Sequence, residues 1–121
     1  MTITDTGNIT QPRDKGGLVK AMIYVNGDGT IARCFNGMTN SSSGGCGFSV
    51  SRSGAGVYVV NFGFQVNDRF YSLTLGNPIF ISGTLAASDL APTLGTNKLW
   101  VSAFDVDDGG YRDTPFTIIV Y

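Results

Sequence analysis

Apolar and polar positions alternate along most of this chain, and the alternation is clearest between residues 53 and 66. Every second residue there is apolar: Tyr58, Val60, Phe62, Phe64 and Val66. Successive side chains of a β-strand point to opposite faces, so the pattern predicts a strand with one continuous apolar face. Such a face must pack against a second sheet or the far wall of a barrel. We therefore expect the other strands of the chain to cover it.

Seven further short strands are predicted, six from alternating segments and one, at 79–82, from a short apolar run. They span residues 18–25, 30–35, 48–52, 70–75, 79–82, 99–104 and 116–121. Residues 26–29 read NGDG, a strong hairpin signal, because Asn-Gly and Asp-Gly readily adopt positive φ. Eight short strands separated by turn residues are typical of an all-β fold, either an antiparallel β-sandwich or a jelly roll.

Two segments between the predicted strands lack the alternation. Residues 36–47 are mostly small polar residues and glycine, which cannot build an interior, so we expect a surface loop. Residues 83–97 are the least regular part of the domain. A single helical turn capped by Ser88 is conceivable there, and Pro92 would end it early.

The pattern also divides the chain. Residues 1–17 are polar and have no periodicity, which predicts a lead-in or linker, and residues 18–121 form a single β-sandwich domain. Within this domain the residues expected to be largely buried are Val19, Ile23, Val25, Phe35, Tyr58, Val60, Phe62, Val101, Ile118 and Val120.

Composition narrows the function more than it narrows the fold. The 121 residues carry nine acidic and eight basic side chains, with no basic run, so nothing attracts the chain to nucleic acid or anionic lipid. There is no histidine, which removes the commonest general base and metal ligand and rules out Ser-His-Asp and Cys-His sites within one chain. We therefore expect no enzymatic activity and no cofactor.

Targeting signals are also missing from the sequence. No window approaches the ~20 apolar residues of a membrane-spanning helix, so no membrane insertion is expected. Residues 1–17 contain no apolar core of a secretory signal, which favours a protein made in the cytoplasm, or released when the cell lyses, over an exported one.

The two cysteines, Cys34 and Cys46, stand twelve residues apart across the glycine- and serine-rich loop. A disulfide that closes a loop of this length would be worth ~3 kcal/mol in the chain-entropy model. Two unpaired thiols in a reducing cytosol are the alternative, and the sequence leaves both open. A zinc site is not expected, because two soft ligands are too few.

The aspartates of the C-terminal turn are the main carboxylate cluster. They are Asp105, Asp107, Asp108 and Asp113, and their alternation with glycine resembles a calcium loop. An EF-hand loop also needs a distal glutamate, and the chain contains no glutamate. A solvated turn is the favoured interpretation, a weak cation site is the alternative, and no metal site is predicted.

Aromatic side chains remain as candidates for recognition, because they bury a large area and several carry a polar group. They are Tyr24, Tyr71, Trp100, Tyr111 and Tyr121, which could stack on sugars, line a subunit interface or simply pack in the core. Tyr111 and Arg112 are the pair best suited to a sugar, one by stacking and the other by donating hydrogen bonds. With Asp108 in the same turn and Asn40 in the 36–47 loop, they are the predicted ligand-binding residues, unless the turn merely connects two strands.

The order of several motifs resembles a family. The matching stretches are Lys20-Ala21, residues 26–30 (NGDGT), 31–36 (IARCFN), 48–50 (FSV), 54–62 (GAGVYVVNF) and 113–120 (DTPFTIIV). Together they frame residues 18–121 and resemble the C-terminal domain of tailed-bacteriophage tail-fibre and related virion proteins. Each motif alone is a generic turn or strand signal, and only their order and spacing carry weight.

The resemblance implies a β-sandwich knob, often trimeric, at the tip of a virion fibre that contacts a host-surface glycan or protein. A homotrimer is also expected from the closing strand, because Ile119 and Tyr121 leave apolar surface on its second face. The predicted function is thus host-surface recognition or fibre trimerisation in a virion. The alternative is a stand-alone bacterial lectin or a structural assembly protein with a trimeric jelly roll.

Overall fold

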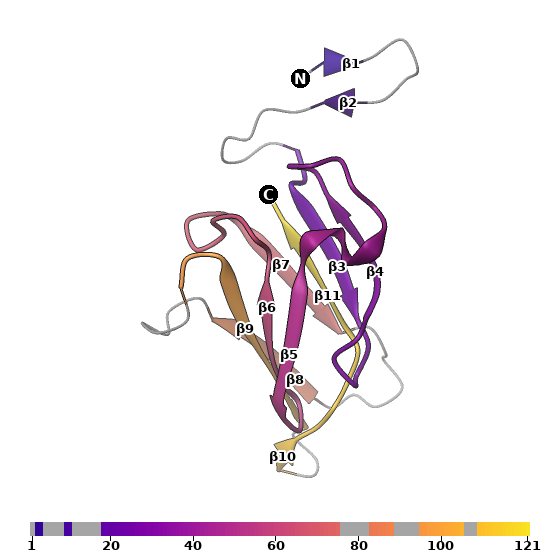
Figure 1. Ribbon diagram of the computed structural model, residues 1–121. Coiled ribbons are helices and arrows are strands. Elements are labelled where there is room, and N and C mark those ends of the chain that lie inside the picture. The colour runs from indigo at the N-terminus through magenta and orange to yellow at the C-terminus, as the bar shows by residue number, and fades with distance from the viewer. Residues whose placement is uncertain (1, 4–8, 11–17, 76–82, 89–94, 106–108) are drawn as a thin grey trace.

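The computed structural model describes residues 2–3, 9–10, 18–75, 83–88, 95–105 and 109–121, and within them two antiparallel sheets lie face to face (Figure 1). The first, called the β3 sheet, has the order β4 (Ile31–Asn36), β3 (Ala21–Val25), β11 (Phe116–Val120) and β7 (Tyr71–Leu75). The second, called the β9 sheet, contains β8 (Gly83–Ser88), β9 (Lys98–Asp105), β6 (Val57–Asn61) and β5 (Ser49–Gly54).

Three short elements complete the described structure. β10 (Gly110–Tyr111) pairs with β9 beyond the point where β6 begins, and η1 (Gly44–Gly47) is a 3₁₀ turn before β5. β1 (Thr2–Ile3) and β2 (Ile9–Thr10) pair with each other as a separate two-stranded sheet. No helix among the described residues is long and apolar enough to span a membrane.

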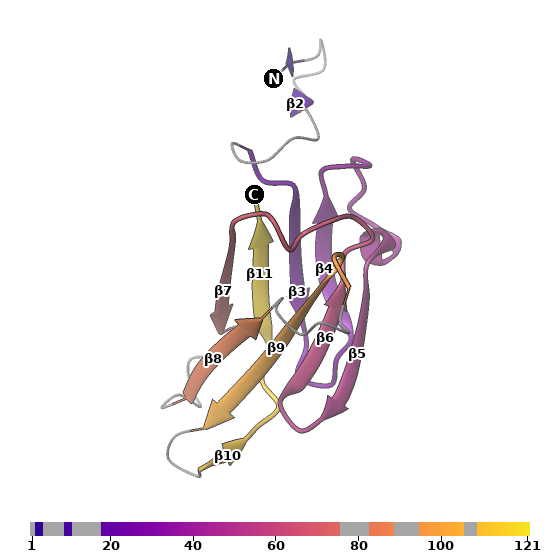
Figure 2. The same ribbon diagram turned by 90° about the vertical axis from the view of Figure 1, so that its left-hand side faces the viewer.

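The predicted fold class is confirmed: the protein is an antiparallel β-sandwich, with eight described strands of five or more residues. The two sheets face each other (Figure 2), and the described residues form an apolar core between them. Its members come from β3, β6, β9, β11 and the segments beside β5 and β6: Ala21, Ile23, Val25, Cys46, Phe48, Tyr58, Val60, Phe62, Val66, Leu99, Val101, Phe116, Ile118 and Val120. The rings of Tyr58 and Phe116 meet across the two sheets with their centroids 5.0 Å apart.

Two of the residues predicted to be buried are only half-buried, Val19 and Phe35. Phe35 pairs with Met22, which points outward between the buried Ala21 and Ile23, so the register places Phe35 on the outer face of the β3 sheet. Val19 precedes the strand, which begins at Ala21, so the period-two pattern does not extend to it. The other eight predicted core residues are buried.

The irregular segment was predicted wrongly at its start. Residues 83–88 form β8, in which Ser88 pairs with Trp100, and the helical turn considered after Ser88 lies outside the described residues. Neighbouring β9 supplies the ladder partners that this weakly patterned sequence needs to become a strand. Pro92 and the predicted strand at 79–82 lie outside the described residues.

The central strand is shorter than its apolar stripe. β6 ends at Asn61, and Gly63 has a φ of 74°, a left-handed conformation that glycine adopts without a Cβ clash. The chain bends at this point, but Phe62 and Val66 remain buried and Phe64 packs on the core from its margin. The stripe therefore predicts burial correctly and strand length incorrectly.

The predicted hairpin at residues 18–35 is confirmed as β3 and β4. The Gly29 amide donates to the Asn26 carbonyl at 2.9 Å and the Asn26 amide to the Thr30 carbonyl at 2.8 Å. Gly29 has a φ of 91°, whereas Asn26 and Gly27 have no positive φ. One left-handed residue therefore suffices to close this turn.

Candidate functional site

The predicted ligand-binding residues lie at opposite ends of the sandwich (Figure 1). Tyr111 and Arg112 are at the end that carries β10, here called the β10 end. Asn40 belongs to the loop that follows β4 at the other end, here called the disulfide end. Asn40 is exposed, and its φ of 55° is a left-handed conformation that asparagine tolerates. Asp108 lies outside the described residues, so the structure does not bring the predicted set together into one site.

Tyr111 stands on the outer face of the β9 sheet. Its backbone pairs with Phe104 of β9, and the two rings make an edge-to-face contact with centroids 5.5 Å apart. The Tyr111 residue is 57% exposed. One edge of the ring is therefore fixed by Phe104, and the rest is free to contact a ligand.

A second exposed aromatic lies on this same face. Along β9, Leu99, Val101 and Ala103 are buried, which places the alternate residues Trp100 and Phe104 on the outer side. Trp100 is 43% exposed. Trp100 and Phe104 are four positions apart along the strand, a distance of roughly 13 Å.

Trp100, Phe104 and Tyr111 together define what we call the aromatic face. Its immediate neighbours on β6 are Val57 and Val59, which pair with Ser102 and Trp100 and are half-buried. Sequence reasoning named Trp100 and Tyr111 separately but missed that they share a face. The alternation in LWVSAF places Trp100 and Phe104 on one side, whereas the pairing of β10 with β9 has no local signal.

Arg112 is already engaged within the fold. Its Nη1 donates to Asp105 Oδ2 at 2.9 Å, and the Asp105 side chain is only 7% exposed. The backbone amide of Arg112 also donates to the Ala103 carbonyl at 3.0 Å. Arg112 therefore stabilises the buried Asp105 carboxylate, and the predicted role as a hydrogen-bond donor to sugars has to compete with that ion pair.

Asp113 is the centre of a polar network at the β10 end. Its Oδ1 accepts hydrogen bonds from the Gly56 amide at 2.7 Å and from Arg52 Nε at 3.0 Å, and its Oδ2 accepts from Arg52 Nη2 at 2.8 Å. The bond to Arg52 is the main reason that the pKa of Asp113 is lowered, and Asp113 raises the pKa of Arg52 in turn.

The buried hydroxyl of Tyr58 extends this network to the hairpin turn. It donates to the Gly27 carbonyl at 2.7 Å, lies 3.3 Å from Asp113 Oδ1 and accepts from the Thr114 amide at 3.3 Å. Burial raises the pKa of Tyr58. A Cβ on Gly56 would stand 2.7 Å from backbone atoms of Ala103 and Arg112, so the turn can approach only because residue 56 is glycine.

The weak cation site considered for the aspartate-rich turn finds no support in the described residues. Asp105 and Asp113 each form an ion pair with an arginine. No group of three or more potential metal ligands occurs in the part of the chain that the structure describes.

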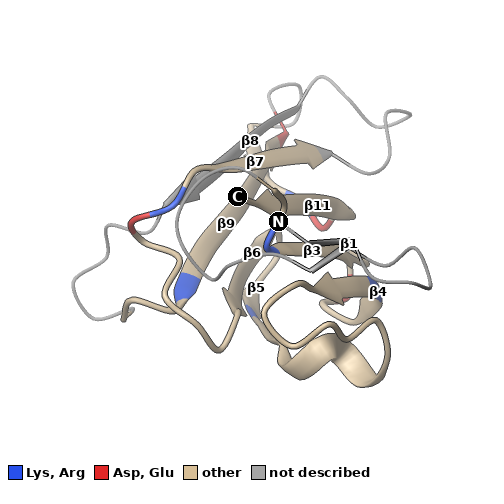
Figure 3. Cartoon of the chain, turned by 90° about the horizontal axis from the view of Figure 1, so that it is seen from above, with Lys and Arg blue, Asp and Glu red and all other residues tan. Residues whose placement is uncertain are grey.

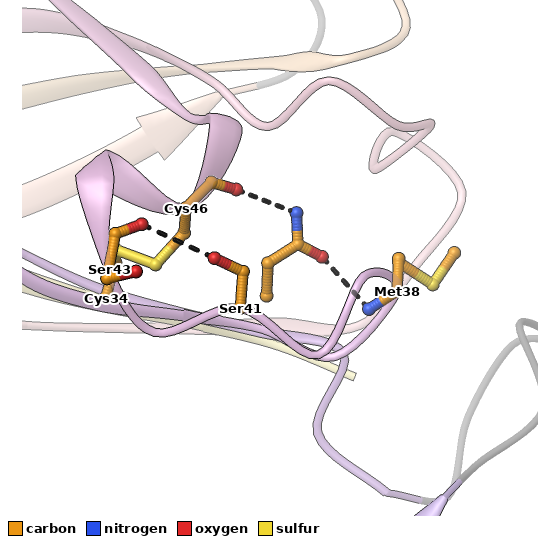
Figure 4. Close-up of a disulfide and its surroundings, with 6 residues drawn as sticks. Cys34, Met38, Ser41, Ser43 and Cys46 are labelled. Atoms are coloured by element: carbon orange, nitrogen blue, oxygen red, sulfur yellow. Dashed lines mark hydrogen bonds between the residues drawn. A yellow bond between two sulfur atoms is a disulfide. The ribbon is translucent and has the colours of Figure 1, made fainter.

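At the disulfide end, Cys34 and Cys46 are bridged, which settles the alternative that the sequence left open (Figure 4). The bridge joins β4 to η1, and Cys46 is 3% exposed. Buried Asn36 fixes the same loop, because its Nδ2 donates to the Cys46 carbonyl at 2.9 Å and its Oδ1 accepts from the Met38 amide at 2.9 Å. The predicted surface loop is thus anchored to the core at Cys46.

A groove of about 550 Å³ lies between this loop and the chain that follows β6. Met38, Thr39, Ser41 and Gly47 form part of one wall, and Phe64 with Gly63 forms part of the other. None of the described residues that line it is charged. The groove therefore offers hydroxyl and backbone polar groups beside an aromatic ring.

The outer face of the β3 sheet is the third exposed apolar region. Met22 is 40% exposed, and with Tyr24, Arg33, Phe35 and Thr117 it lines a shallow hollow of about 200 Å³. The Arg33 guanidinium carbon lies 4.5 Å from the centroid of the Tyr24 ring, a cation–π distance. Viewed from above, most positions in the strands of both sheets are uncharged (Figure 3).

The protein is thus an all-β sandwich with exposed aromatic side chains on one sheet. Its loops are held by hydrogen bonds to Asp113 at one end and by a disulfide at the other. Comparisons with models of protein families, with curated proteins and with solved structures find no match to this chain.

Proposed function

We propose that this chain is a non-enzymatic recognition module of the kind found at the tips of tailed-phage tail fibres, and that it binds a host-surface glycan. The observation that carries the proposal is the aromatic face: Trp100 and Tyr111 are exposed on the outer side of one sheet. Side chains on paired strands hold their spacing better than side chains on loops, which is what recognition of a repeating ligand requires.

The neighbours of these aromatic rings fit a glycan. Sugars present apolar C–H faces that stack on aromatic rings and hydroxyls that exchange hydrogen bonds with polar groups. Ser51 pairs with Val59 and is exposed at the edge of the same sheet, and Ser102 lies between Trp100 and Phe104 along β9. The face thus combines stacking surfaces with short hydroxyl side chains.

The direct test is binding of the purified protein to an array of bacterial surface glycans. The Trp100→Ala, Tyr111→Ala double variant should lose the glycans that the parent protein binds, and its fold should be retained. Phe70→Ala is the matched control, since Phe70 is a 79% exposed aromatic away from the aromatic face. Equal binding by the parent and the double variant would contradict the proposed site.

Trimerisation in a virion is the second part of the proposal, and the outer face of the β3 sheet favours it. Met22, Phe35 and Ile119 lie on that face and would be covered by identical copies. Met22→Glu should reduce the mass measured by light scattering to that of a monomer, whereas Ser51→Glu, at an exposed position of the β9 sheet, should leave the mass unchanged. A monomeric parent protein at micromolar concentration would refute the trimer and favour the alternative, a stand-alone lectin.

A further inference from the structure

We infer that the groove at the disulfide end is a second binding site, separate from the aromatic face, and that it takes a neutral saccharide. The groove is formed by residues that the fold holds firmly on one side. Cys46 is covalently tied to β4, and buried Asn36 spans the loop from Cys46 to Met38. A wall that is fixed before the ligand arrives loses little conformational entropy on binding.

The second wall follows the bend at Gly63. Phe62 is 1% exposed and packs edge-to-face on Phe48, with ring centroids 5.2 Å apart. Phe64 lies next to Phe62, with centroids 6.2 Å apart, and is half-buried. The buried Phe62 therefore holds Phe64 in place, and part of the Phe64 ring lines the groove.

The two walls approach each other through glycine. A Cβ placed on Gly63 would stand 3.6 Å from the Gly47 carbonyl oxygen, and both residues have positive φ, 74° and 77°. Both positions are glycine, so no side chain covers the backbone at this approach, although the Gly63 amide already donates to Asn61 Oδ1 at 2.9 Å.

The chemistry of the lining decides the class of ligand. None of the described lining residues is charged, and Arg69, whose guanidinium carbon lies 5.6 Å from the centroid of the Phe64 ring, is not part of the lining. A charged ligand would therefore lose hydration without a charged lining residue to pair with. A wholly apolar ligand would desolvate the Thr39 hydroxyl, and the acceptor side of the Ser41 hydroxyl, without replacing their hydrogen bonds; the Ser41 hydroxyl itself donates to the Ser43 carbonyl at 3.4 Å. A neutral saccharide meets both conditions, because its hydroxyls can bond with Thr39 and Ser41 while its C–H face contacts Phe64 and Met38.

The volume is consistent with a small ligand. At about 550 Å³ the groove falls within the ~300–1,000 Å³ of ordinary ligand sites. It is an open groove at the surface, so we expect it to hold one end of a glycan chain and not to enclose it.

The test is a titration of the ¹⁵N-labelled, disulfide-bonded protein with the methyl glycosides of glucose, galactose, mannose and N-acetylglucosamine, each followed by two-dimensional NMR. At least one glycoside should cause saturable shifts of the Thr39, Ser41, Gly47 and Gly63 amides at millimolar concentration. Methyl glucuronoside, which is charged, should shift them less.

Variants decide whether the shifts report this groove. Phe64→Ala and the exposed-residue variant Thr39→Ala should each lose or strongly weaken the saturation, whereas Trp100→Ala and Tyr111→Ala should leave it unchanged. Thr39→Ala keeps the test decisive if Phe64→Ala fails to fold. No saturable shift with any of the glycosides, or shifts that persist in Thr39→Ala, would overturn the site. The proposed function is tested by variants of the aromatic face, which lie outside this groove. A negative result for the groove therefore leaves the proposed function untouched.

Discussion

The two ends of the sandwich fix their long connections by different physical means. At the β10 end, hydrogen bonds between polar groups hold the connections: Asp113 accepts from Arg52 and Gly56, and the Tyr58 hydroxyl donates to the Gly27 carbonyl. At the disulfide end, the covalent bond between Cys34 and Cys46 holds the loop, and Asn36 adds a hydrogen bond to the Cys46 carbonyl. The first solution depends on a charged carboxylate and the second on an oxidised sulfur pair, so the two ends should respond to different conditions.

The comparison also shows where each end obtains its rigidity. The β10 end joins segments that are far apart in sequence, since Arg52 and Asp113 are 61 residues apart. The disulfide end joins residues only twelve apart. A local loop of glycine and serine contributes few side chains for packing, so a cross-link can order it where apolar contacts cannot.

The largest expected effect comes from opening the disulfide. The Cys34→Ser, Cys46→Ser double variant should lower the free energy of unfolding by about 3 kcal/mol, because the unfolded chain regains the entropy of the closed loop. Urea unfolding of the variant and of the parent, with and without reductant, measures this. Reductant should destabilise the parent and leave the double variant unchanged. An equal response of both proteins would show that the bridge does not stabilise the fold.

Asp113→Asn should have the next largest effect, a loss of about 1–2 kcal/mol at neutral pH, because the charged partner of Arg52 is removed and the Gly56 amide keeps a weaker acceptor. The ion pair itself contributes only part of this loss, since both side chains are more than a third exposed and are screened by solvent. Folding lowers the pKa of Asp113, chiefly through Arg52. Its contribution is therefore complete above the ordinary aspartate pKa of about 3.9 and is lost as the pH falls through the lower folded-state value.

Unfolding measured across acidic pH checks the sign. From about pH 5 downward the parent should lose more stability than Asp113→Asn does, because only the parent has this carboxylate to protonate. Asp28 also has a lowered pKa, chiefly from its bond to the Thr30 hydroxyl, so Asp28→Asn is the control for other titrating turn residues. Parallel curves for the parent and Asp113→Asn would contradict the role assigned to Asp113.

The smallest expected losses of stability come from Arg112→Ala and Tyr111→Ala, and the first should exceed the second. Arg112→Ala removes the ion pair that Arg112 forms with the buried Asp105 carboxylate and should cost about 1–2 kcal/mol, since the exposed arginine is partly screened by solvent. Tyr111→Ala removes one exposed ring and should cost about 0.5 kcal/mol. Thermal unfolding of the two single variants measures the difference. Equal melting temperatures would show that the ion pair contributes nothing.

Sequence alone is enough to predict the class of fold and much of the core. The period-two pattern identifies Tyr58, Val60, Ile118 and Val120 because a strand with one buried face has a strict period of two. It fails at Phe35, whose face is set by pairing with Met22. It also fails at residues 83–88, where a neighbouring strand decides the structure and local preference does not.

The candidate site is harder to predict from the sequence than the fold is. Tyr111 and Trp100 can be recognised as aromatic residues free to bind, but their common face depends on the pairing of β10 with β9. The Arg112–Asp105 ion pair is hidden for the same reason, because its partners stand seven positions apart across the turn. The alternation places Lys20 on the polar side of its strand, whereas it is 1% exposed and its ammonium group donates to the Leu18 carbonyl.

Amide hydrogen exchange, expressed as protection factors, tests the difference between the two ends most directly. Reduction at neutral pH should lower protection at residues 36–48 and leave residues 26–30 and 112–114 unchanged. Acidification of the oxidised protein should do the reverse, because it protonates Asp113 and leaves the disulfide intact. If reduction and acidification lowered protection equally at both ends, the two ends would form one cooperative unit, which would contradict their separate anchoring by a carboxylate and by a disulfide.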